Sequence, residues 1–229
     1  MSIYKLKQSR HSSHSQVLRI LGQGYRRRLL DVGCADGDFS SQLVAQGWDV
    51  TGIEPSEGDA ALAAERGIRV VKGTIEEELP KLSETFDAVL LADVLEHCVE
   101  PWEQLSRVKD NCTPSTVVVI SIPNVAHLSV RSQLALGRFA YTDKGILDRT
   151  HMRFFTRKSL IELITQAGFQ IQDMWFTPAP VELVFPRLNL SKEGRALLDV
   201  NAMLARSWPS LFAYQFIALC SLSKSMEHP

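Results

Sequence analysis

The sequence predicts an α/β protein with a doubly wound, mainly parallel β-sheet, and three observations lead to this fold class. Apolar runs alternate with helix-like segments for most of the 229 residues, which is the pattern of consecutive strand–helix–strand units. The run at 115–123 is rich in β-branched residues without interruption, as expected for a strand that is buried on both faces. A glycine-rich turn at 33–37 directly follows the first run, at the strand–helix junction where open α/β sheets bind ligands.

The first half of the chain contains three predicted strands separated by two short helices. Each helix-like segment ends in a glycine, which is typical of a helix C-terminus. In order, we predict a strand at 27–34, a helix at 39–47, a strand at 49–55, a helix at 59–67 and a strand at 68–74.

The second half continues the alternation and brings the number of strands to seven. Pro101 fits the first turn of a helix, Thr156 is a good N-cap, and Gly168 marks a helix end. In order, we predict a strand at 86–93, a helix at 101–112, a strand at 115–123, a helix at 156–169, a strand at 169–177, a helix at 191–208 and a strand at 211–222.

Two segments stand apart from this alternation, within a single predicted domain over 1–229 that shows no internal repeat. Residues 1–25 are basic, and Ser13 or Ser15 could cap an amphipathic helix there. Residues 123–155 interrupt the rhythm and are predicted to form an insertion or lid on the acceptor side of the site. We expect this insertion to tighten when ligand binds. His14 and Tyr4 would close over a ligand as part of an N-terminal flap, or His14 would serve the helix end.

The charge is unevenly distributed although the net charge is only −1. Residues 1–28 carry seven basic and no acidic side chains, residues 29–110 carry six basic and eighteen acidic ones, and residues 131–158 carry seven basic and two acidic ones. These stretches are either solvated faces or an acidic half opposite a basic rim that meets an anionic small-molecule acceptor. The pI of 6.6 argues against nucleic acid as a partner.

The composition excludes several other classes. No segment reaches the roughly 18 apolar residues of a membrane span, and the N-terminus lacks the apolar core of a secretory signal. The four cysteines are scattered, which favours reduced thiols and a cytoplasmic protein. A homodimer is compatible with the sequence. No cluster of carboxylates with metal-ligand spacing follows the strand at 86–93, so no metal site is predicted.

The turn "LLDVGCADG" predicts a ligand that is not a pyrophosphate. Gly33, Ala35 and Gly37 allow close backbone approach, but their spacing differs from the GxGxxG dinucleotide motif. Glu54 ends the second strand about twenty residues later, where a carboxylate accepts hydrogen bonds from ribose hydroxyls.

Three carboxylates in or beside the turn, Asp31, Asp36 and Asp38, would oppose a phosphate and favour a cation. Opposite charges at about 4 Å attract by roughly 1 kcal/mol in water and about 4 kcal/mol near a protein surface. S-adenosylmethionine has an adenosine, a sulfonium and an ammonium, and it has no phosphate. It is therefore the predicted cofactor.

With these motifs the chain resembles the class I S-adenosylmethionine-dependent methyltransferases over about residues 26–180. The resemblance rests on "LLDVGCADG", "VTGIEPS" and "FDAVLLADVLEHCVEP". "IPNVAH" and "GILDRTHMRFFTRKSL" resemble the branch that includes surface-polysaccharide and ubiquinone-pathway O-methyltransferases. The resemblance implies a Rossmann-like, seven-stranded sheet with an antiparallel last strand.

The resemblance also assigns roles to residues of the cofactor site. Asp31 would orient the glycine loop and approach the methionine ammonium, and Glu54 would hold the ribose. The residues assigned to the cofactor are Asp31, Gly33, Cys34, Ala35, Gly37, Glu54, Pro55, Gly73, Thr74, Ile75, Ala92, Asp93 and His97.

Transfer to a hydroxyl benefits from a general base, and histidine is the side chain best suited at neutral pH. His151, close to Asp148, is the first candidate, and His127 is the second. His97 has either a structural role or a cofactor contact. The alternative for each histidine is a hydrogen-bonded structural role.

The candidate acceptor-binding residues come from the insertion and its neighbourhood. Asn124 would bond the acceptor hydroxyl or hold the turn after Pro123. Arg149 and Arg153, with Arg131 and Arg138, would grip an anionic group or form a solvated rim. The aromatic residues that would line an apolar pocket, or belong to the core, are Trp175, Phe176, Phe185 and Trp208.

The predicted function is therefore methyl transfer to a hydroxyl of a sugar or glycan precursor. The first alternative is O-methylation of a phenol in quinone or secondary metabolism, which would want an apolar slot in an insertion that here is rich in Arg and Lys. A protein that binds S-adenosylmethionine without catalysis is a second alternative. A NAD-dependent oxidoreductase is disfavoured by the acidic loop, and methylation of adenine or glutamine by the "ADVLEH" end of strand four.

Overall fold

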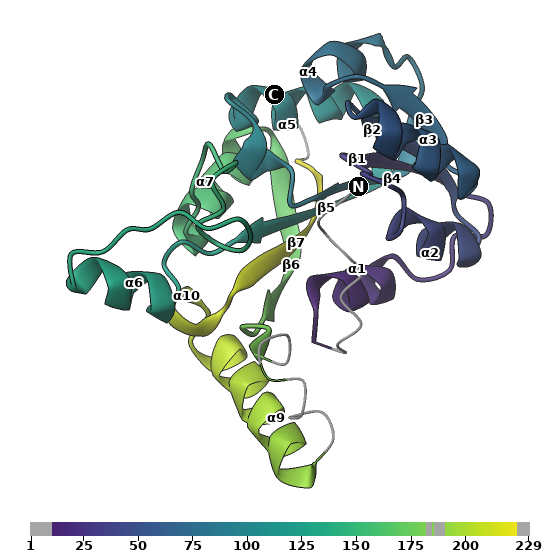
Figure 1. Ribbon diagram of the computed structural model, residues 1–229. Helices are drawn as coiled ribbons and strands as arrows, with labels where there is room; N and C mark the ends of the chain where they lie inside the picture. Colours follow the sequence, from purple (N-terminus) through teal and green to yellow (C-terminus); the bar gives the residue numbers. More distant parts are fainter. Residues whose placement is uncertain (1–10, 182–184, 186–190, 224–229) are drawn as a thin grey trace, which may run out of the picture.

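The computed structural model describes residues 11–181, 185 and 191–223. It contains one seven-stranded sheet with the strand order β3-β2-β1-β4-β5-β7-β6 (Figure 1). The strands are β1 (Arg28–Val32), β2 (Asp49–Glu54), β3 (Arg69–Lys72), β4 (Phe86–Ala92), β5 (Cys112–Pro123), β6 (Phe169–Thr177) and β7 (Gln215–Leu222).

The strand directions confirm the predicted topology. The first five strands pair in parallel, and β7 runs antiparallel to both β5 and β6. The strand order reverses between β1 and β4, which places the glycine turn at the point where ligands of open α/β sheets bind.

Helices cover both faces of the sheet because its central strands are apolar on both sides. Along β4, Ala88 and Leu90 pack into one core while Val89 and Leu91 pack into the other, as the alternation of a strand requires. The core that contains Ala88 and Leu90 is closed by α1 (Ser13–Leu21), α2 (Ser40–Ala45) and α3 (Glu57–Glu65). The core on the other face is closed by α4 (Ile75–Glu78), α5 (Pro101–Arg107), α7 (Arg157–Gln166) and the 3₁₀ turns η1 (Leu79–Lys81), η2 (Leu95–His97) and η3 (Val108–Asn111).

Several predicted boundaries were wrong by a few residues. The predicted helix at 101–112 changes to 3₁₀ geometry in η3, and β5 begins at Cys112 instead of residue 115. The start of the predicted strand at 211–222 is helical, because Pro209 opens the short helix α10 (Pro209–Phe212) before β7.

The N-cap of α1 is Ser12, so the prediction of Ser13 or Ser15 was wrong. Ser12 has an extended backbone, and its side chain accepts a hydrogen bond from the Ser15 backbone N–H at 3.2 Å. Ser13 and Ser15 already lie in the helical first turn, where they cannot supply this geometry. The prediction for Thr156 is confirmed, since Thr156 caps α7 and exchanges bonds with Ser159 in a capping box. Tyr4 lies outside the described residues.

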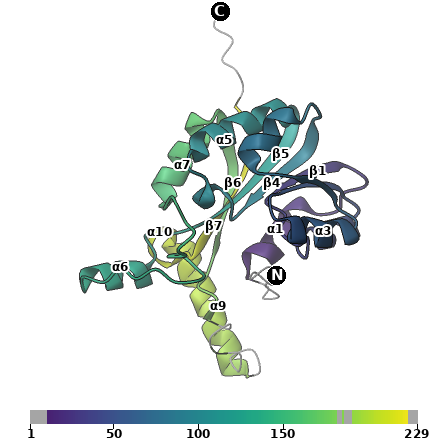
Figure 2. The same ribbon diagram turned by 45° about the horizontal axis from the view of Figure 1, so that its top comes forward.

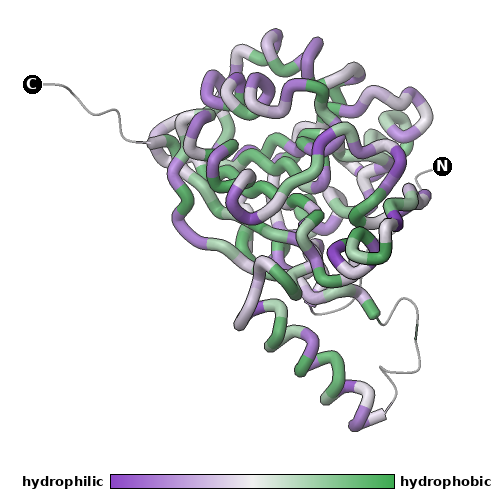
Figure 3. The backbone as a smooth tube through the Cα atoms, turned by 90° about the vertical axis from the view of Figure 1, so that its left-hand side faces the viewer, coloured by the Kyte–Doolittle hydropathy of each residue, from purple (hydrophilic) through white to green (hydrophobic). Residues whose placement is uncertain are grey.

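Two helices project from the body of the sheet. α6 (Leu128–Ala135) belongs to the 123–155 insertion, and α9 (Lys192–Ser207) precedes α10 (Figures 1 and 2). Apolar and polar residues alternate along α9, which stands away from the core (Figure 3). Among the described residues, every helix falls short of the length or apolarity needed to cross a membrane.

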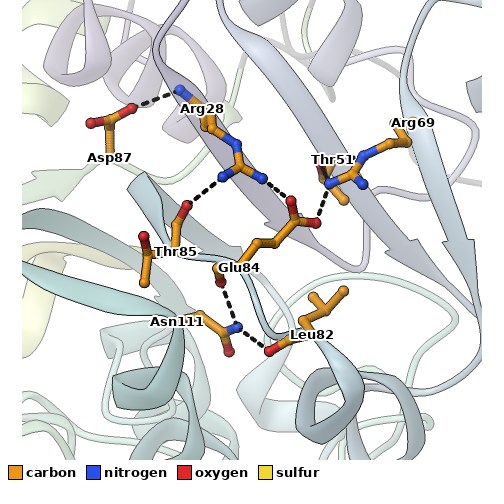
Figure 4. A network of polar contacts seen from close by, with 8 residues as sticks. All are labelled: Arg28, Thr51, Arg69, Leu82, Glu84, Thr85, Asp87 and Asn111. Atoms are coloured by element: carbon orange, nitrogen blue, oxygen red, sulfur yellow. Dashed lines mark hydrogen bonds and ion pairs between the residues drawn. The ribbon is translucent and has the colours of Figure 1, made fainter.

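The amino ends of the central strands are closed by a polar network (Figure 4). Arg28 and Arg69 both bond the carboxylate of Glu84, and the backbone N–H of Arg28 donates to Asp87 at 2.8 Å. Asn111 donates to the carbonyls of Leu82 and Glu84 at 2.9 and 3.0 Å. This end of the sheet is therefore held by its own side chains, and the candidate site lies at the opposite end.

Candidate functional site

The glycine turn leaves β1 with a backbone that few side chains tolerate. Gly33, Ala35 and Gly37 have φ values of 72°, 50° and 75°. A Cβ atom on Gly33 would lie 2.9 Å from a methyl carbon of Val94, so only glycine fits there. The backbone N–H of Gly33 donates to the carbonyl of Ile53 at 2.9 Å, which fastens the turn to the end of β2. Gly33 itself is exposed and presents bare backbone to a ligand.

Glu54, the last residue of β2, joins the turn to the loop after β2. One carboxyl oxygen accepts from the Ala35 N–H at 2.9 Å, and the other accepts from the Ser56 N–H at 2.8 Å. Each oxygen keeps a second lone pair for a ligand hydroxyl. Burial raises the pKa of Glu54, and the two backbone N–H groups oppose this shift.

Asp31 lies beneath the turn, where it is 4% exposed and accepts a hydrogen bond from the Ser40 hydroxyl. Burial raises the pKa of Asp31 to about 7, the bond from Ser40 opposes this rise, and the nearby charge of Glu54 adds to it. A buried carboxyl with such a pKa gains from a cation placed beside it.

The end of β4 contributes a carboxylate on a strained backbone. Asp93 has a φ of 57°, and its Oδ1 accepts from Ser121 at 3.0 Å and from Gln215 at 2.7 Å. These donors come from β5 and β7, so three strands fix the position of Asp93. Ala92, directly before it, is half-buried at the same strand end.

The predicted adenine-side residues gather after β3. The Gly73 N–H donates to the carbonyl of Glu54 at 3.1 Å, and Thr74 caps α4 through a capping box with Glu77. Ile75 is 7% exposed, whereas Pro55 is exposed. The fold therefore brings these residues beside the ribose-side carboxylate.

The side chain of Cys34 packs inside the protein, so only the backbone of this residue is available to the candidate cofactor site. Its side chain is 5% exposed, and its sulfur occupies the space that a Cβ atom would need at Gly52. Burial raises the pKa of the Cys34 thiol far above its ordinary value, so the thiol is unreactive.

His97 and His151 meet beside η2. Their ring centroids lie 4.8 Å apart in an edge-on arrangement, and the rings are half-buried and 8% exposed respectively. Nδ1 of His97 lies 3.2 Å from the carbonyl of Thr150, and Nδ1 of His151 lies 3.1 Å from that of Ile146. Burial lowers the pKa of His151, and the neighbouring His97 lowers it further.

His127 has a different arrangement, as the N-cap of α6. Its Nδ1 accepts from the backbone N–H of Ser129 at 3.2 Å, and its ring meets Tyr214 edge-on at 5.8 Å. Since the cap uses the lone pair of Nδ1, the neutral ring carries its proton on Nε2. His127 is then a hydrogen-bond donor toward a ligand. Burial lowers its pKa.

The three predicted acceptor-binding residues are engaged within the protein. Asn124 is 0% exposed, donates to the carbonyl of Ala213 at 2.8 Å and accepts from Ala126 N–H at 2.9 Å, which favours the turn-holding alternative. Arg149 pairs with Asp143 at 2.5 Å on the surface. Arg153 donates to the carbonyl of Val99. The contacts of the two arginines support the alternative of a solvated surface rim over the binding of an anionic acceptor group.

The predicted aromatic pocket divides between core and surface. Trp175 and Phe176 are half-buried against the two cores. Phe185 and Trp208 are 62% and 59% exposed.

Several residues of the site escaped the sequence analysis. Ser121, Gln215 and Tyr214 have no local signal, because their partners are distant in the chain. Ser40 bonds Asp31 nine positions away, but no motif marks this contact. Glu96 stood next to a candidate histidine in "LEHC" and could have been noticed.

The described residues fit S-adenosylmethionine at the carboxyl end of the sheet. Gly33 offers exposed backbone, Glu54 offers one open lone pair on each carboxyl oxygen, and Asp31 offers a buried carboxyl that favours a cation. Gly33 would face the methionine part of the cofactor, Glu54 its ribose and Asp31 its ammonium group.

Comparison with known proteins agrees with this geometry. Residues 7–173 match the model of a family described as methyltransferase domain. A "Ubiquinone biosynthesis O-methyltransferase" of Azorhizobium caulinodans is 31% identical over 186 residues, covering 77% of this chain and 70% of that protein.

Solved structures show the same fold. A SAM-dependent methyltransferase from Archaeoglobus fulgidus has a TM-score of 0.63 at 24% identity, covering 93% of this chain and 95% of that one. A 1,6-didemethyltoxoflavin-N1-methyltransferase from Burkholderia thailandensis, solved with bound S-adenosylhomocysteine, has a TM-score of 0.58 at 18% identity, covering 92% and 76%.

Proposed function

The chain belongs to the class I S-adenosylmethionine-dependent methyltransferases, and we propose that its acceptor is a phenolic hydroxyl on the aromatic ring of a quinone precursor. The sequence analysis placed a sugar hydroxyl first and a phenol second. The relatives named for ubiquinone biosynthesis support the phenol. So does the surface of the 123–155 insertion.

That surface is more apolar than its basic composition indicated. Phe139, Tyr141 and Phe154 contact one another as rings at centroid distances of 5.4 to 6.4 Å. Large apolar side chains of the insertion are also solvent-exposed, namely Leu128, Leu134, Leu136, Phe139, Tyr141 and Met152. An apolar, ring-bearing acceptor would cover such side chains, whereas a sugar would leave them in water.

The observation that carries the proposal is the position of His151, whose ring lies 4.8 Å from that of His97 in η2, just after β4, and 6.3 Å from that of Phe154 in the apolar insertion. The carbonyl of Ile146 can only accept a hydrogen bond, so Nδ1 of His151 carries the proton and Nε2 keeps a lone pair. Of the two predicted bases, His151 therefore has the nitrogen suited to a hydroxyl proton, and His127 does not.

Catalysis depends mainly on alignment. The cofactor supplies an electrophilic methyl group on its sulfonium when bound. Glu54 would hold the ribose hydroxyls, Asp31 would face the ammonium, and the exposed backbone of Gly33 would hold the methionine end. The insertion would position the acceptor oxygen beside the methyl group and keep water away from it.

The test is a transfer assay with tritium-labelled methyl groups and two acceptors, an alkylated catechol and a nucleotide sugar. We expect label in the catechol ether, with turnover reduced by about 10² to 10⁴-fold in His151→Gln because a group in contact with the acceptor oxygen is lost. The matched control is His11→Gln, since His11 contacts Asp199 of α9 and has no assigned role in the site. Label in the sugar alone would refute the proposal.

A further inference from the structure

The 123–155 insertion has a small apolar core of its own, and Tyr214 joins this core to the sheet. Val130, Ile146 and Leu147 are buried and pack together. Tyr214, directly before β7, packs against them and is, among the described residues of this cluster, the one that lies outside the insertion. A change at Tyr214 therefore reaches the insertion directly.

The backbone of Tyr214 is fixed by the chain at the ends of β5 and β6. Its N–H donates to the carbonyl of Thr177 at 2.8 Å, and its carbonyl accepts from the N–H of Asn124 at 2.9 Å. The next residue, Gln215, donates to the carboxylate of Asp93 at 2.7 Å. The side chain of Tyr214 thus extends from a well-anchored point at the carboxyl ends of the central strands.

The hydroxyl of Tyr214 lies in the turn that contains Gly145 and Ile146. A Cβ atom on Gly145 would lie 2.6 Å from the hydroxyl oxygen, so the missing side chain makes room for the phenol. Burial raises the pKa of Tyr214, and a hydrogen bond with the backbone of Ile146 lowers it. The N–H of Ile146 is therefore the donor, because a bond from the phenol to a carbonyl would stabilise the protonated form.

Ile146 uses its other backbone group to hold His151. Its carbonyl lies 3.1 Å from Nδ1 of His151, which places the imidazole proton on Nδ1 and leaves a lone pair on Nε2. One residue thus joins the Tyr214 hydroxyl to the imidazole that serves as the base in the proposed function. An imidazole released from this carbonyl can carry its proton on either nitrogen, and only one of these tautomers is a base at Nε2.

We propose that Tyr214 is a positioning residue that holds the His151 imidazole, through Ile146, in the tautomer and orientation required of the base. Its effect on turnover rests on the proposed function, whereas its hold on the imidazole does not. With the imidazole so held, the proton of the acceptor hydroxyl moves to Nε2 of His151 and the oxygen forms its bond to the methyl carbon. The electron pair of the breaking carbon–sulfur bond stays on sulfur.

Tyr214→Phe isolates this contact because it removes one hydroxyl and keeps the ring. The edge-on packing of the ring against His127, at 5.8 Å, does not need the hydroxyl. The other ionisable groups around His151 are unchanged in this variant, namely Asp93, Glu96, His97 and Asp148. A changed state of the His151 imidazole would therefore come from the lost hydrogen bond.

The first experiment is long-range ¹H–¹⁵N NMR of the ligand-free, full-length protein at about pH 8, where the imidazole of His151 is neutral. His151→Gln assigns the signals. We expect the wild type to show the form protonated on Nδ1, and Tyr214→Phe to show both tautomers. The matched control is Tyr25→Phe, since Tyr25 is 82% exposed and precedes β1 at the opposite end of the sheet. An unchanged tautomer in Tyr214→Phe would overturn the proposal.

The second experiment measures methylation of the alkylated catechol. Tyr214→Phe should lower kcat by about 10- to 100-fold and leave both KM values nearly unchanged, because misplacement of a reacting group by about 1 Å costs up to about 100-fold. In a His151→Gln background the same change should have no further effect, since Tyr214 acts through His151. An equal fall of kcat in both backgrounds would show that Tyr214 acts by another route, and the proposal would then fail.

Two further measurements keep the outcomes separate. Binding of S-adenosylmethionine by calorimetry verifies that each variant is folded. If Tyr214→Phe does not fold, Gly145→Ala repeats the NMR test, because its methyl group would displace the Tyr214 hydroxyl from Ile146. If the wild type methylates no phenol while Tyr214→Phe changes the tautomer of His151, the proposed function fails and the hold of Tyr214 on His151 stands.

Discussion

Asp31, which we propose to face the ammonium group of the cofactor, lowers the stability of the folded protein at neutral pH. Its pKa rises from 3.8 to about 7 on burial, so the folded protein binds this proton more tightly than the unfolded chain does. Stability must therefore fall as the pH increases from about 4 to about 7. A shift of about 3 units corresponds to roughly 4 kcal/mol as an upper limit.

Replacement of Asp31 by Asn should remove this pH dependence. We expect Asp31→Asn to be more stable than the wild type above pH 7, by up to a few kcal/mol, and to bind S-adenosylmethionine at least about tenfold more weakly. Urea unfolding at pH 5 and pH 8, together with calorimetric titration of the cofactor, measures both effects. An unchanged difference in stability between the two pH values would contradict the assignment.

Glu54 should matter for the cofactor far more than its acidic neighbours do. In Glu54→Gln an amide N–H₂ must face one of the two backbone N–H donors, and the charge that strengthens hydrogen bonds to ribose is lost. We expect cofactor affinity to fall by about 100-fold, whereas Glu57→Gln, an exposed change in α3, should leave it unaltered. Calorimetry with S-adenosylhomocysteine compares the two variants, and equal affinities would argue against the assignment of Glu54.

Among the helices, α7 offers a clean measure of what a capping residue contributes. Thr156 caps its first turn, and Thr165 lies exposed near its other end with its hydroxyl bonded to the carbonyl of Ile161. Thr156→Ala should destabilise the protein by about 1 kcal/mol, and Thr165→Ala by much less. The midpoints of urea unfolding test this difference, and similar midpoints would mean that the cap is dispensable.

The 123–155 insertion should respond to ligands in two different ways along its length. Val130 is the buried residue of α6, whereas residues 146–148 and 151 are buried, and Met152 and Arg153 beside them donate backbone hydrogen bonds to Glu96 of η2. We expect α6 to exchange its amide hydrogens quickly in the free protein and to become protected when cofactor and acceptor bind. Hydrogen–deuterium exchange resolved by peptide measures this, and equal exchange with and without ligands would show that the insertion does not tighten.

Across the whole molecule, the polar network around Glu84 and the proposed cofactor site lie at opposite ends of the sheet. Glu84 bonds Arg28 and Arg69 at the amino ends of the strands, with side chains that are a quarter to more than half exposed. Glu84→Ala should therefore cost about 1 kcal/mol of stability and leave cofactor affinity unchanged. Thermal unfolding and calorimetry test the two statements separately, and a loss of affinity would show that the ends are coupled.

The parts of the fold that follow from local patterns were predictable. The alternation of strands and helices predicted seven strands, and "LLDVGCADG" with Glu54 predicted a glycine turn and a carboxylate at the ends of the first two strands, where the structure joins them by a hydrogen bond. Boundaries such as the α5–η3 transition and the start of β7 depend on proline positions and packing, so they were missed by a few residues.

The parts of the site that depend on long-range contacts were not predictable. Gln215 donates a hydrogen bond to Asp93, 122 positions earlier in the chain, and His151 of the insertion contacts His97, which precedes the insertion. Asn124 and Arg153 have the right residue types for ligand binding, but the structure uses their polar groups for its own carbonyls. A residue type indicates what chemistry is available, and only packing decides what it faces.

The antiparallel strand β7 also has a consequence for biosynthesis. Ribosomes add residues in order, so β1 to β6 leave the exit tunnel before β7, although β7 lies between β5 and β6 in the finished sheet. Until then β6 lacks its neighbour, and Asp93 lacks the hydrogen bond from Gln215. The glycine turn and Glu54 can form on the nascent chain well before that moment. During translation, the polypeptide should therefore acquire its nucleoside-holding half first and its methyl-transfer half only after residues 215–222 have emerged.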